Sequence, residues 1–461
     1  MSVSAGNTDS FDSVVTAING PISAFAWGWP TVGLISVTGI LLMVGLKFMP
    51  ILRLSYGVRM MLAPSDPRAE GDISSFQALM TSLAATVGTG NIAGVAGAIA
   101  IGGPGAVFWM WLIAFFGIAT KYAEAVLAVH YREVDELGNH VGGPMYYISK
   151  GLGPRWVWLG GVFALFGMLA GFGIGNGVQC FEVSSALLGL GVPRELTALV
   201  LGVLVFAVII GGVRRISKAA SAIVPFMAIA YVLACLIILI ANIGSIGDAF
   251  SSIFSNAFTG QAAATGTLTQ VILMGFKRGI FSNEAGLGSA PIAHAAARTD
   301  DPVRQGTVAM LGTFIDTMII CTLTALVILV SGIAGGGLSG SELSIAAFNE
   351  ALDGSGWIVT FGLLVFAFTT VLGWSFYGER CTEYLFGVKA ILPFRGVWVA
   401  VVVIGSLVGD RGVVWGVADT LNGLMAIPNL IALLLLSGTV FELTRRYHFP
   451  DASESSADRI A

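Results

Sequence analysis

The sequence contains little charge. Only 11% of its 461 residues are Asp, Glu, Lys or Arg, whereas 56% are hydrophobic, and the mean hydropathy is +0.86. A soluble domain carries about 25% charged residues, so this chain has too few to cover a surface that faces water. Apolar stretches recur from Phe25 to Phe441, each near the roughly 20 residues that cross the hydrocarbon core of a bilayer. The composition therefore predicts a protein that crosses a lipid bilayer many times.

Motifs of enzyme chemistry are missing as well. The apolar segments contain neither HExxH nor GxSxG, and of the four histidines only His130 and His294 fall within predicted spans, each near an end, which argues against an intramembrane enzyme. The sequence also lacks the ring of charged residues that would indicate a channel. The four cysteines form no CxxC pair and no metal spacing, as is typical of small buried apolar side chains; they are Cys180, Cys235, Cys321 and Cys381. We expect no organic cofactor and no nucleic-acid partner, and the sequence leaves the oligomeric state open.

The N-terminal segment lacks basic residues. It carries Asp9 and Asp12, and an apolar stretch follows at about residue 22 and runs to Met49. Because this stretch is too long for a signal-peptide core and has no basic leader, it is expected to be a retained span. We therefore predict a polar segment over 1–21 and a transmembrane helix over 22–50.

Apolar segments and their Gly, Pro or charged breaks predict eleven spans. The expected spans are 25–47, 74–101, 106–130, 157–189, 196–212, 219–242, 267–296, 306–331, 356–379, 395–409 and 413–442.

The distribution of Lys and Arg predicts the orientation of these spans. If the first span runs from outside to inside, only Arg194 and Arg411 fall outside, and Lys121, Lys277 and Arg278 lie at membrane depth. The remaining eighteen of the 23 basic residues fall inside: Lys47, Arg53, Arg59, Arg68, Arg132, Lys150, Arg155, Arg214, Arg215, Lys218, Arg298, Arg304, Arg380, Lys389, Arg395, Arg445, Arg446 and Arg459. The prediction is a multi-pass protein of the cell (inner) membrane, with its N-terminus outside and its C-terminus in the cytoplasm.

Ten of the spans divide into two groups of five. The first group, 74–245, and the second, 262–443, each begin with a glycine-interrupted span. Since five is odd, the second group has inverted topology, and two broken helices at matching positions of inverted repeats indicate a transporter binding site. The expected architecture is an all-α membrane protein with one N-terminal helix, a 5+5 inverted-repeat core and a cytoplasmic tail over 444–461.

The first interrupted segment, 86–94, holds three glycines and the small polar residues Thr89 and Asn91. An unwound backbone survives in a bilayer only beside a cavity or a ligand. Freed N–H groups at a half-helix suit a carboxylate, and freed carbonyls suit a hard cation such as sodium. The alternative is close helix packing through small residues, which Gly90, Gly94 and Gly97 also fit.

The second interrupted segment carries charge. Lys277, Arg278 and Glu284 lie at membrane depth, where charges mark functional sites by default. Gly279 follows the two cations, so a bend is expected there, with carbonyls left free. The alternative is a structural ion pair with Glu284 or with an acid on a neighbouring helix. The sequence does not decide what these three residues do.

Two further clusters are candidates. Thr369 and Thr370 place hydroxyls at mid-membrane depth, and Thr370 shares a helix face with Trp374; membrane threonines also often bond their own helix. Residues 172–176 offer an aromatic wall, or equally a packing face.

Long runs of the sequence resemble the alanine/glycine:cation symporter family, also called the sodium:alanine symporters. The similar runs cover nearly the whole chain in order and include GDISSFQAL (71–79), ATVGTGNIAGVA (85–96), IGGPGAVFWMW (101–111), GFGIGNGVQ (171–179), KRGIFSNEAGLGSAPIAHAAA (277–297) and FTTVLGWSFYGE (368–379). The resemblance implies the leucine-transporter fold, with five-plus-five inverted repeats, two broken core helices and one extra N-terminal helix.

The resemblance also implies site residues. The amino acid's carboxylate would bind at the unwound run through Thr89 and Gly90, with Asn91 beside them. Its side chain would meet Thr370 and Trp374. The remaining pocket lining would come from Gly275, Phe276 and Ile280, with Phe172 and Gly173 opposite.

The sodium site common to the fold would use five uncharged oxygens. They are the carbonyls of Ala84, Val87 and Phe366 and the hydroxyls of Thr369 and Thr370. A second sodium site could use the Asn91 side chain and the Thr86 carbonyl. The expected function is therefore sodium-coupled uptake of a small neutral amino acid, alanine or glycine, by alternating access. A proton-coupled carrier is the alternative, and it would more naturally use a carboxylate.

Overall fold

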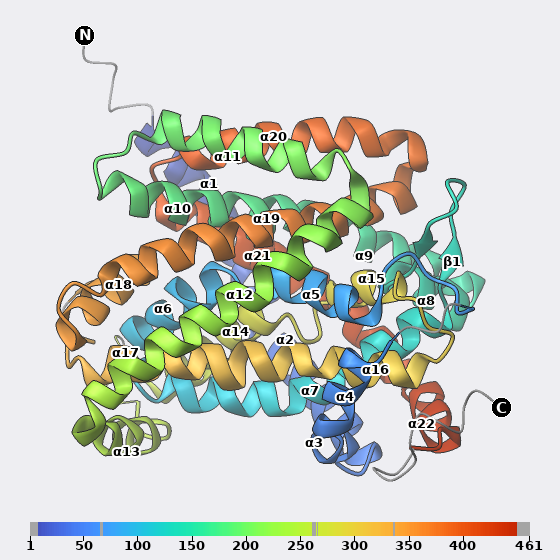
Figure 1. The fold of residues 1–461 in the computed structure, drawn as a ribbon, viewed down its shortest axis with the longest axis horizontal. Coiled ribbons are helices and arrows are strands. Elements are labelled where there is room, and N and C mark those ends of the chain that lie inside the picture. Colours follow the sequence, from blue (N-terminus) through green and yellow to red (C-terminus); the bar gives the residue numbers. More distant parts are fainter. Residues whose placement is uncertain (1–7, 65–67, 261–263, 265, 335–336, 450–461) are drawn as a thin grey trace.

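The computed structural model describes residues 8–64, 68–260, 264, 266–334 and 337–449, and these residues are mostly helical (Figure 1). The chain enters through four helices: α1 (Thr8–Ala26), α2 (Trp29–Gly45), α3 (Met49–Leu52) and α4 (Leu54–Leu62).

The next set of elements contains the first broken helix. It comprises α5 (Ser75–Thr86), a 3-10 turn (Thr89–Asn91), α6 (Ala93–Gly102), α7 (Ala106–His130), the strands β1 (Glu133–Val134) and β2 (His140–Val141), α8 (Pro144–Gly151), a 3-10 turn (Pro154–Trp156), α9 (Val157–Ala170), a π-helical segment (Gly171–Gly177), α10 (Val178–Leu188), α11 (Arg194–Ile209) and α12 (Gly212–Ala241).

The last set contains the second broken helix. It comprises a 3-10 turn (Ile243–Ser245), α13 (Ile246–Asn256), α14 (Leu268–Asn283), α15 (Ala290–Ala295), α16 (Pro302–Thr313), a π-helical segment (Phe314–Cys321), α17 (Thr322–Val330), α18 (Gly340–Ala351), α19 (Gly356–Phe386), a 3-10 turn (Val388–Ala390), α20 (Ile391–Leu407), α21 (Arg411–Leu435) and α22 (Ser437–Arg446).

Among the described residues, eight helices are long and apolar enough to cross a membrane, and the bent pair 75–86 and 89–102 makes a ninth span. The other two of the eleven predicted spans are present as shorter helices. α11 has 16 residues, and α14 also has 16 because the chain leaves the helix at Glu284. The expected eleven helices are therefore roughly matched.

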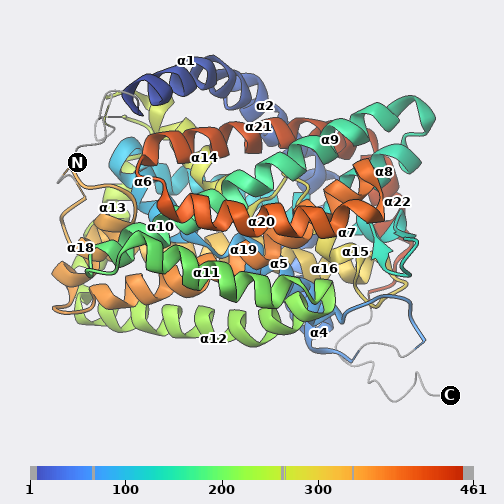
Figure 2. The same ribbon diagram turned by 90° about the horizontal axis from the view of Figure 1, so that it is seen from above.

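The long helices run between two ends of the molecule, which differ in what they carry. In Figure 1 the strands, α8 and α22 lie on the right, here called the hairpin end, and α13 and α18 lie on the left, here called the α13 end. Figure 2 shows α1 along one edge, over α21, and α12 along the opposite edge. The two broken helices lie between these edges, and α5 packs against both α12 and α19.

Specific residues start the broken helices. Ser74 caps α5 in a reciprocal arrangement in which its hydroxyl accepts from Gln77 N (3.1 Å) and its own N–H donates to Gln77 Oε1 (3.0 Å). Such a capping box satisfies backbone groups that a helix end leaves free. At the hairpin end, Ile73 forms a parallel bridge with Ala297, so the segment before α5 is joined to the segment after α15. The two broken helices are therefore tied together where both reach the hairpin end.

Candidate functional site

The first break lies between α5 and α6, whose axes are bent by 60°. Its backbone donors are satisfied by neutral side chains. Asn91 Oδ1 accepts from Gly88 N at 2.9 Å, and Gln179 Oε1, from α10, accepts from Thr89 N at 3.1 Å. The 3-10 turn Thr89–Asn91 is fully buried. An unwound backbone in a bilayer needs such partners. The acceptors of these two N–H groups are uncharged.

Glycine at the first break lets α19 come close. A Cβ at Gly88 would lie 2.5 Å from Thr370 Oγ1, and one at Gly90 would lie 3.1 Å from the Phe281 ring. The Thr370 hydroxyl donates to Val87 O at 3.4 Å. The break in one core helix therefore touches both the other broken helix and α19.

Four of the five oxygens predicted for sodium take part in two separate sets of hydrogen bonds. Val87 O meets the Thr370 hydroxyl, and the Thr369 hydroxyl donates to Phe366 O at 2.9 Å and to Val365 O at 3.1 Å. The bond to Val365 is the intrahelical threonine bond that the sequence left as an alternative. Ala84 is buried one turn before Val87 on α5, and α19 approaches closely there, since a Cβ at Gly373 would lie 2.8 Å from Ala85 N.

The second break begins later than expected. α14 runs unbroken through Gly279 to Asn283, so the predicted bend at Gly279 is wrong. A Cβ at Gly279 would lie 2.8 Å from Ile113 of α7, and this glycine therefore serves helix packing. The chain leaves the helix at Glu284, which has a left-handed backbone (φ 57°), and then turns at two glycines with positive φ, Gly286 and Gly288.

A buried carboxylate holds the second break. Glu124 Oε1, from α7, accepts from Gly286 N at 3.1 Å and from Gly288 N at 3.0 Å, and from the Asn429 amide of α21 at 2.7 Å. Both Glu124 and Asn429 are fully buried. One oxygen therefore joins three parts of the protein, namely α7, α21 and the unwound segment.

The charges of α14 pair with an acid on a neighbouring helix, one of the alternatives that the sequence left open. Lys277 Nζ lies 2.7 Å from Asp419 Oδ2, and the Arg278 guanidinium lies 3.4 Å from both Asp419 oxygens. Arg278 also lies over the Trp415 ring, 4.5 Å from its centroid. Glu284 makes different bonds: it accepts from Trp374 Nε1 at 2.7 Å and from Ser289 Oγ at 2.5 Å.

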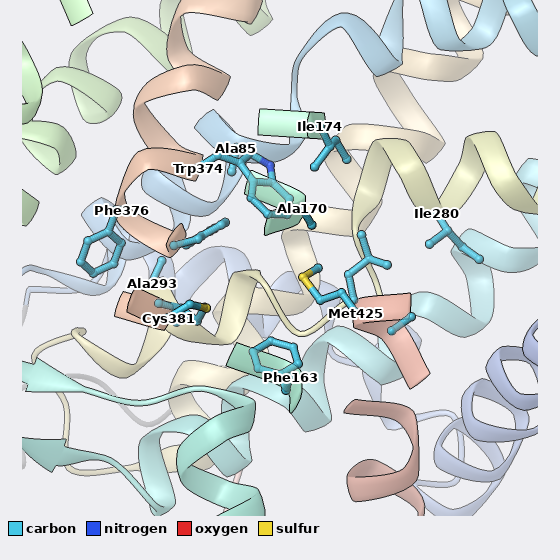
Figure 3. Close-up of a cluster of buried hydrophobic side chains, with 14 of the residues drawn as sticks. Ala85, Phe163, Ala170, Ile174, Ile280, Ala293, Trp374, Phe376, Cys381 and Met425 are labelled. Atoms are coloured by element: carbon cyan, nitrogen blue, oxygen red, sulfur yellow. The ribbon is translucent and has the colours of Figure 1, made fainter. Parts of the chain in front are cut away.

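The predicted lining residues of α14 and α19 fall into two groups, and the second group, Gly275 and Phe276, faces α7. Trp374 and Ile280 are buried, and Figure 3 shows the Trp374 ring near Ala85 and Ala170. Phe276 is buried with its ring 6.0 Å from that of Trp109 on α7. Gly275 also faces α7, because a Cβ there would lie 2.5 Å from Ala106 O.

The residues expected on the opposite wall also face other helices. Phe172 packs against Phe394 and Trp398 of α20, with ring centroids 5.4 Å apart in both cases, and a Cβ at Gly173 would lie 2.9 Å from Ala418. Instead, Gly175 contacts Trp374: a Cβ at Gly175 would lie 2.2 Å from Trp374 Cβ.

Sequence reasoning missed Asp316. It is fully buried in the π-helical segment Phe314–Cys321. Its carboxylate accepts from the Asn91 amide at 2.7 Å, the Ser282 hydroxyl at 2.8 Å and the Thr317 hydroxyl at 2.8 Å. Asp316 therefore joins the first break to the end of α14. An acid inside an apolar span was the available signal.

The fold has a counterpart among solved structures. The crystal structure of MhsT in complex with L-phenylalanine, a transporter of the leucine-transporter fold, matches with a TM-score of 0.54, covering 82% of this chain and 99% of that one. At 14% identity, this match shows the fold alone. It confirms the predicted all-α architecture with two broken core helices.

The chain belongs to the sodium:alanine symporter family, whose model matches residues 12–459. It is 51% identical to the sodium/alanine symporter AgcS of Methanococcus maripaludis over 95% of this chain and 97% of that one. It is 39% identical to the "Probable sodium/glutamine symporter GlnT" of Bacillus subtilis, over 94% of this chain and 91% of that one. The chain is thus a multi-pass membrane transporter and not an enzyme, as predicted, and its family supports sodium-coupled amino-acid symport.

Proposed function

We propose that the chain takes up a small neutral amino acid, alanine or glycine, together with sodium by alternating access. One contact carries the proposal: the Thr370 hydroxyl meets Val87 O at 3.4 Å, so α19 supplies oxygen at the point where the first broken helix frees its carbonyls. Uncharged oxygens of this kind suit a hard monovalent cation. The relative that is named a sodium/alanine symporter, at 51% identity, supports both the ion and the substrate class.

The amino acid would bind beside this ion. Its carboxylate would take the backbone N–H groups of Thr89 and Gly90, which begin the half-helix leading into α6. The Thr89 N–H is held by a neutral side-chain oxygen of Gln179, and a carboxylate could replace that acceptor. The ring of Trp374, which is fully buried, would limit the length of the substrate's side chain. Sodium and amino acid would each stabilise the same arrangement of the break, which couples their binding reciprocally.

Orientation is part of the proposal. Basic residues gather at the hairpin end, where Arg132 follows α7, Lys150 lies in the last turn of α8 and Arg445 lies in the last turn of α22. Cytoplasmic segments carry such an excess. We therefore infer a protein of the cell (inner) membrane with the hairpin end in the cytoplasm and the N-terminus outside.

A proton-coupled carrier is the second candidate because of one observation. Asp316 is a fully buried carboxylate that accepts hydrogen bonds from the neutral side chains of Asn91, Ser282 and Thr317. A buried acid of this kind is the group that proton coupling would use. The same carboxylate would also serve a second sodium ion next to Asn91.

Uptake of radiolabelled alanine into proteoliposomes distinguishes the two. We expect accumulation with an inward sodium gradient at fixed pH and none with an inward proton gradient in the absence of sodium. Accumulation that follows the proton gradient alone would refute sodium coupling. Accumulation of neither alanine nor glycine under any gradient would refute the substrate.

A further inference from the structure

Glu284 occupies an unusual position at the second break. Its backbone is left-handed, with a φ of 57°, a conformation that residues with a side chain rarely adopt. Its N–H makes the last helical bond of α14, to Ile280 O at 2.8 Å, and its left-handed backbone ends the helix. Strained backbone conformations of this kind persist where the surrounding structure fixes them and often mark functional positions. Only 1% of Glu284 is exposed, so the side chain is committed to partners inside the protein.

Those partners fix both carboxylate oxygens. Oε1 accepts from the indole N–H of Trp374 at 2.7 Å, and Oε2 accepts from the hydroxyl of Ser289 at 2.5 Å. Trp374 belongs to α19, and Ser289 directly precedes α15. The carboxylate therefore joins the far side of the unwound segment to the ring that would limit the substrate.

The bond to Glu284 is the main polar contact that fixes the rotation of the Trp374 ring. The other described contacts of the ring are apolar or aromatic: it lies edge-on to Tyr377 at 5.5 Å, and Gly171 and Gly175 leave space for it, since Cβ atoms there would lie 3.6 Å and 2.2 Å from atoms of Trp374. Glycines beside an indole make room for the ring but do not choose its direction. The Glu284 bond is directional and can do so.

We propose that Glu284 is a positioning residue that sets the depth of the substrate pocket by holding the Trp374 indole. This inference rests on the proposed function, in which Trp374 borders the side chain of the amino acid. Movement of the second break during transport would then move the wall of the pocket as well. Glu284 would select for small substrates without touching them.

The molecule contains a matched pair elsewhere. Glu182 of α10 is also fully buried, its Oε1 accepts from Trp415 Nε1 at 2.9 Å and its Oε2 from Ser341 Oγ at 2.6 Å. This Glu–Trp–Ser arrangement has the same chemistry as that of Glu284 but involves a different tryptophan. It therefore serves as the control for the general effect of removing a buried glutamate that holds an indole.

The test measures selectivity in proteoliposomes. Inhibition of sodium-driven alanine uptake by 2-aminobutyrate, valine, leucine and glutamine is compared for the wild type and for Glu284→Ala, Glu284→Gln, Trp374→Phe and the double variant Glu284→Ala/Trp374→Phe. We expect Glu284→Ala to improve inhibition by the larger amino acids about fivefold or more relative to alanine, because loss of the hydrogen bond to the indole frees the ring. Glu284→Gln should keep the wild-type profile, since its amide oxygen still accepts from the indole.

The double variant and the control exclude a merely structural role. Phenylalanine has no N–H, so Trp374→Phe should shift the profile, and adding Glu284→Ala should change it little further. Glu182→Ala should leave the selectivity profile unchanged, whatever it does to the rate. If Glu284→Ala does not fold, Glu284→Asp carries the test, because its shorter side chain withdraws the acceptor from the indole and should shift the profile in the same direction.

Three results would overturn the inference: a wild-type profile in Glu284→Ala or in Trp374→Phe, equal effects of Glu284→Gln and Glu284→Ala, or independent effects that multiply in the double variant. Wild-type protein that accumulates none of these amino acids would instead refute the proposed function, and the inference with it. Failure confined to the variants would leave the proposed function standing.

Discussion

The two broken helices satisfy their unwound backbones by different chemistry. At the first break, the acceptors are the neutral amide oxygens of Asn91 and Gln179. At the second break, the acceptor for two backbone N–H groups is the carboxylate of Glu124, and the residue that ends the helix is itself an acid, Glu284. Both breaks lie inside the protein, where an unpaired backbone group would be costly.

This difference assigns the two breaks different tasks. A carboxylate that already holds the backbone donors leaves them unavailable to an anionic ligand, so the second break is suited to connecting helices. Neutral acceptors can be exchanged for a ligand's carboxylate at little electrostatic expense, so the first break is suited to binding. Substitutions at the second break should therefore lower stability, whereas substitutions at the first break should alter ligand binding.

The largest effect is expected at the second break, from Glu124→Ala. The change removes the acceptor of Gly286 N, Gly288 N and the Asn429 amide, and each buried donor left unpaired costs about 1–3 kcal/mol. We expect a lower melting temperature of the purified protein and loss of transport. Glu124→Gln, which keeps an acceptor oxygen, is the matched control and should recover part of the stability. Native stability in Glu124→Ala would remove the structural role assigned to this break.

An intermediate effect is expected where the first break meets α19. Thr370→Val keeps the side-chain volume but removes the hydroxyl that contacts Val87 O. The sodium concentration for half-maximal alanine uptake should rise about tenfold, the size expected for one lost polar interaction of about 1.4 kcal/mol. The melting temperature should change little.

Thr81→Val is the control for this prediction. Like Thr370, Thr81 is fully buried, but it belongs to α5 and its hydroxyl donates to Gln77 O of its own helix at 2.7 Å. The sodium concentration for half-maximal alanine uptake by Thr81→Val should stay at the wild-type value. The same sodium dependence in Thr370→Val and the wild type would contradict the proposed ion site.

The sequence predicted the fold well because membrane helices depend on local properties. Apolar length and glycine breaks are readable along the chain, and the first break occurs where glycines and Thr89 predicted it. The resemblance to the symporter family, quoted from runs such as 85–96 and 277–297, is confirmed by the family match.

The details of the site depended on contacts between distant residues, which the sequence does not display. Gly279 looked like a hinge but packs against Ile113, and the chain turns instead at Glu284. Asp316 stood alone in an apolar span, and its role emerges only when Asn91 and Ser282 are placed beside it. The spacing of residues shows which of them share one face of a helix. Whether that face meets a ligand or another helix depends on the tertiary structure.

The smallest effects are expected within the first broken helix, where position decides between binding and packing. A Cβ at Gly90 would lie 3.1 Å from the Phe281 ring and 3.3 Å from Ser282 Cα, so Gly90→Ala should raise the KM for alanine a few-fold, the effect of a steric conflict of about 1 kcal/mol, at the low end for a group added to a packed site. At Gly97, in α6, an added Cβ would meet nothing within 4 Å. Gly97→Ala should therefore leave the KM unchanged and, because alanine favours a helix over glycine by about 1 kcal/mol, slightly raise the melting temperature. Equal losses of uptake in both variants would mean that small residues along this helix serve close packing, and that the first break is not distinguished by ligand binding.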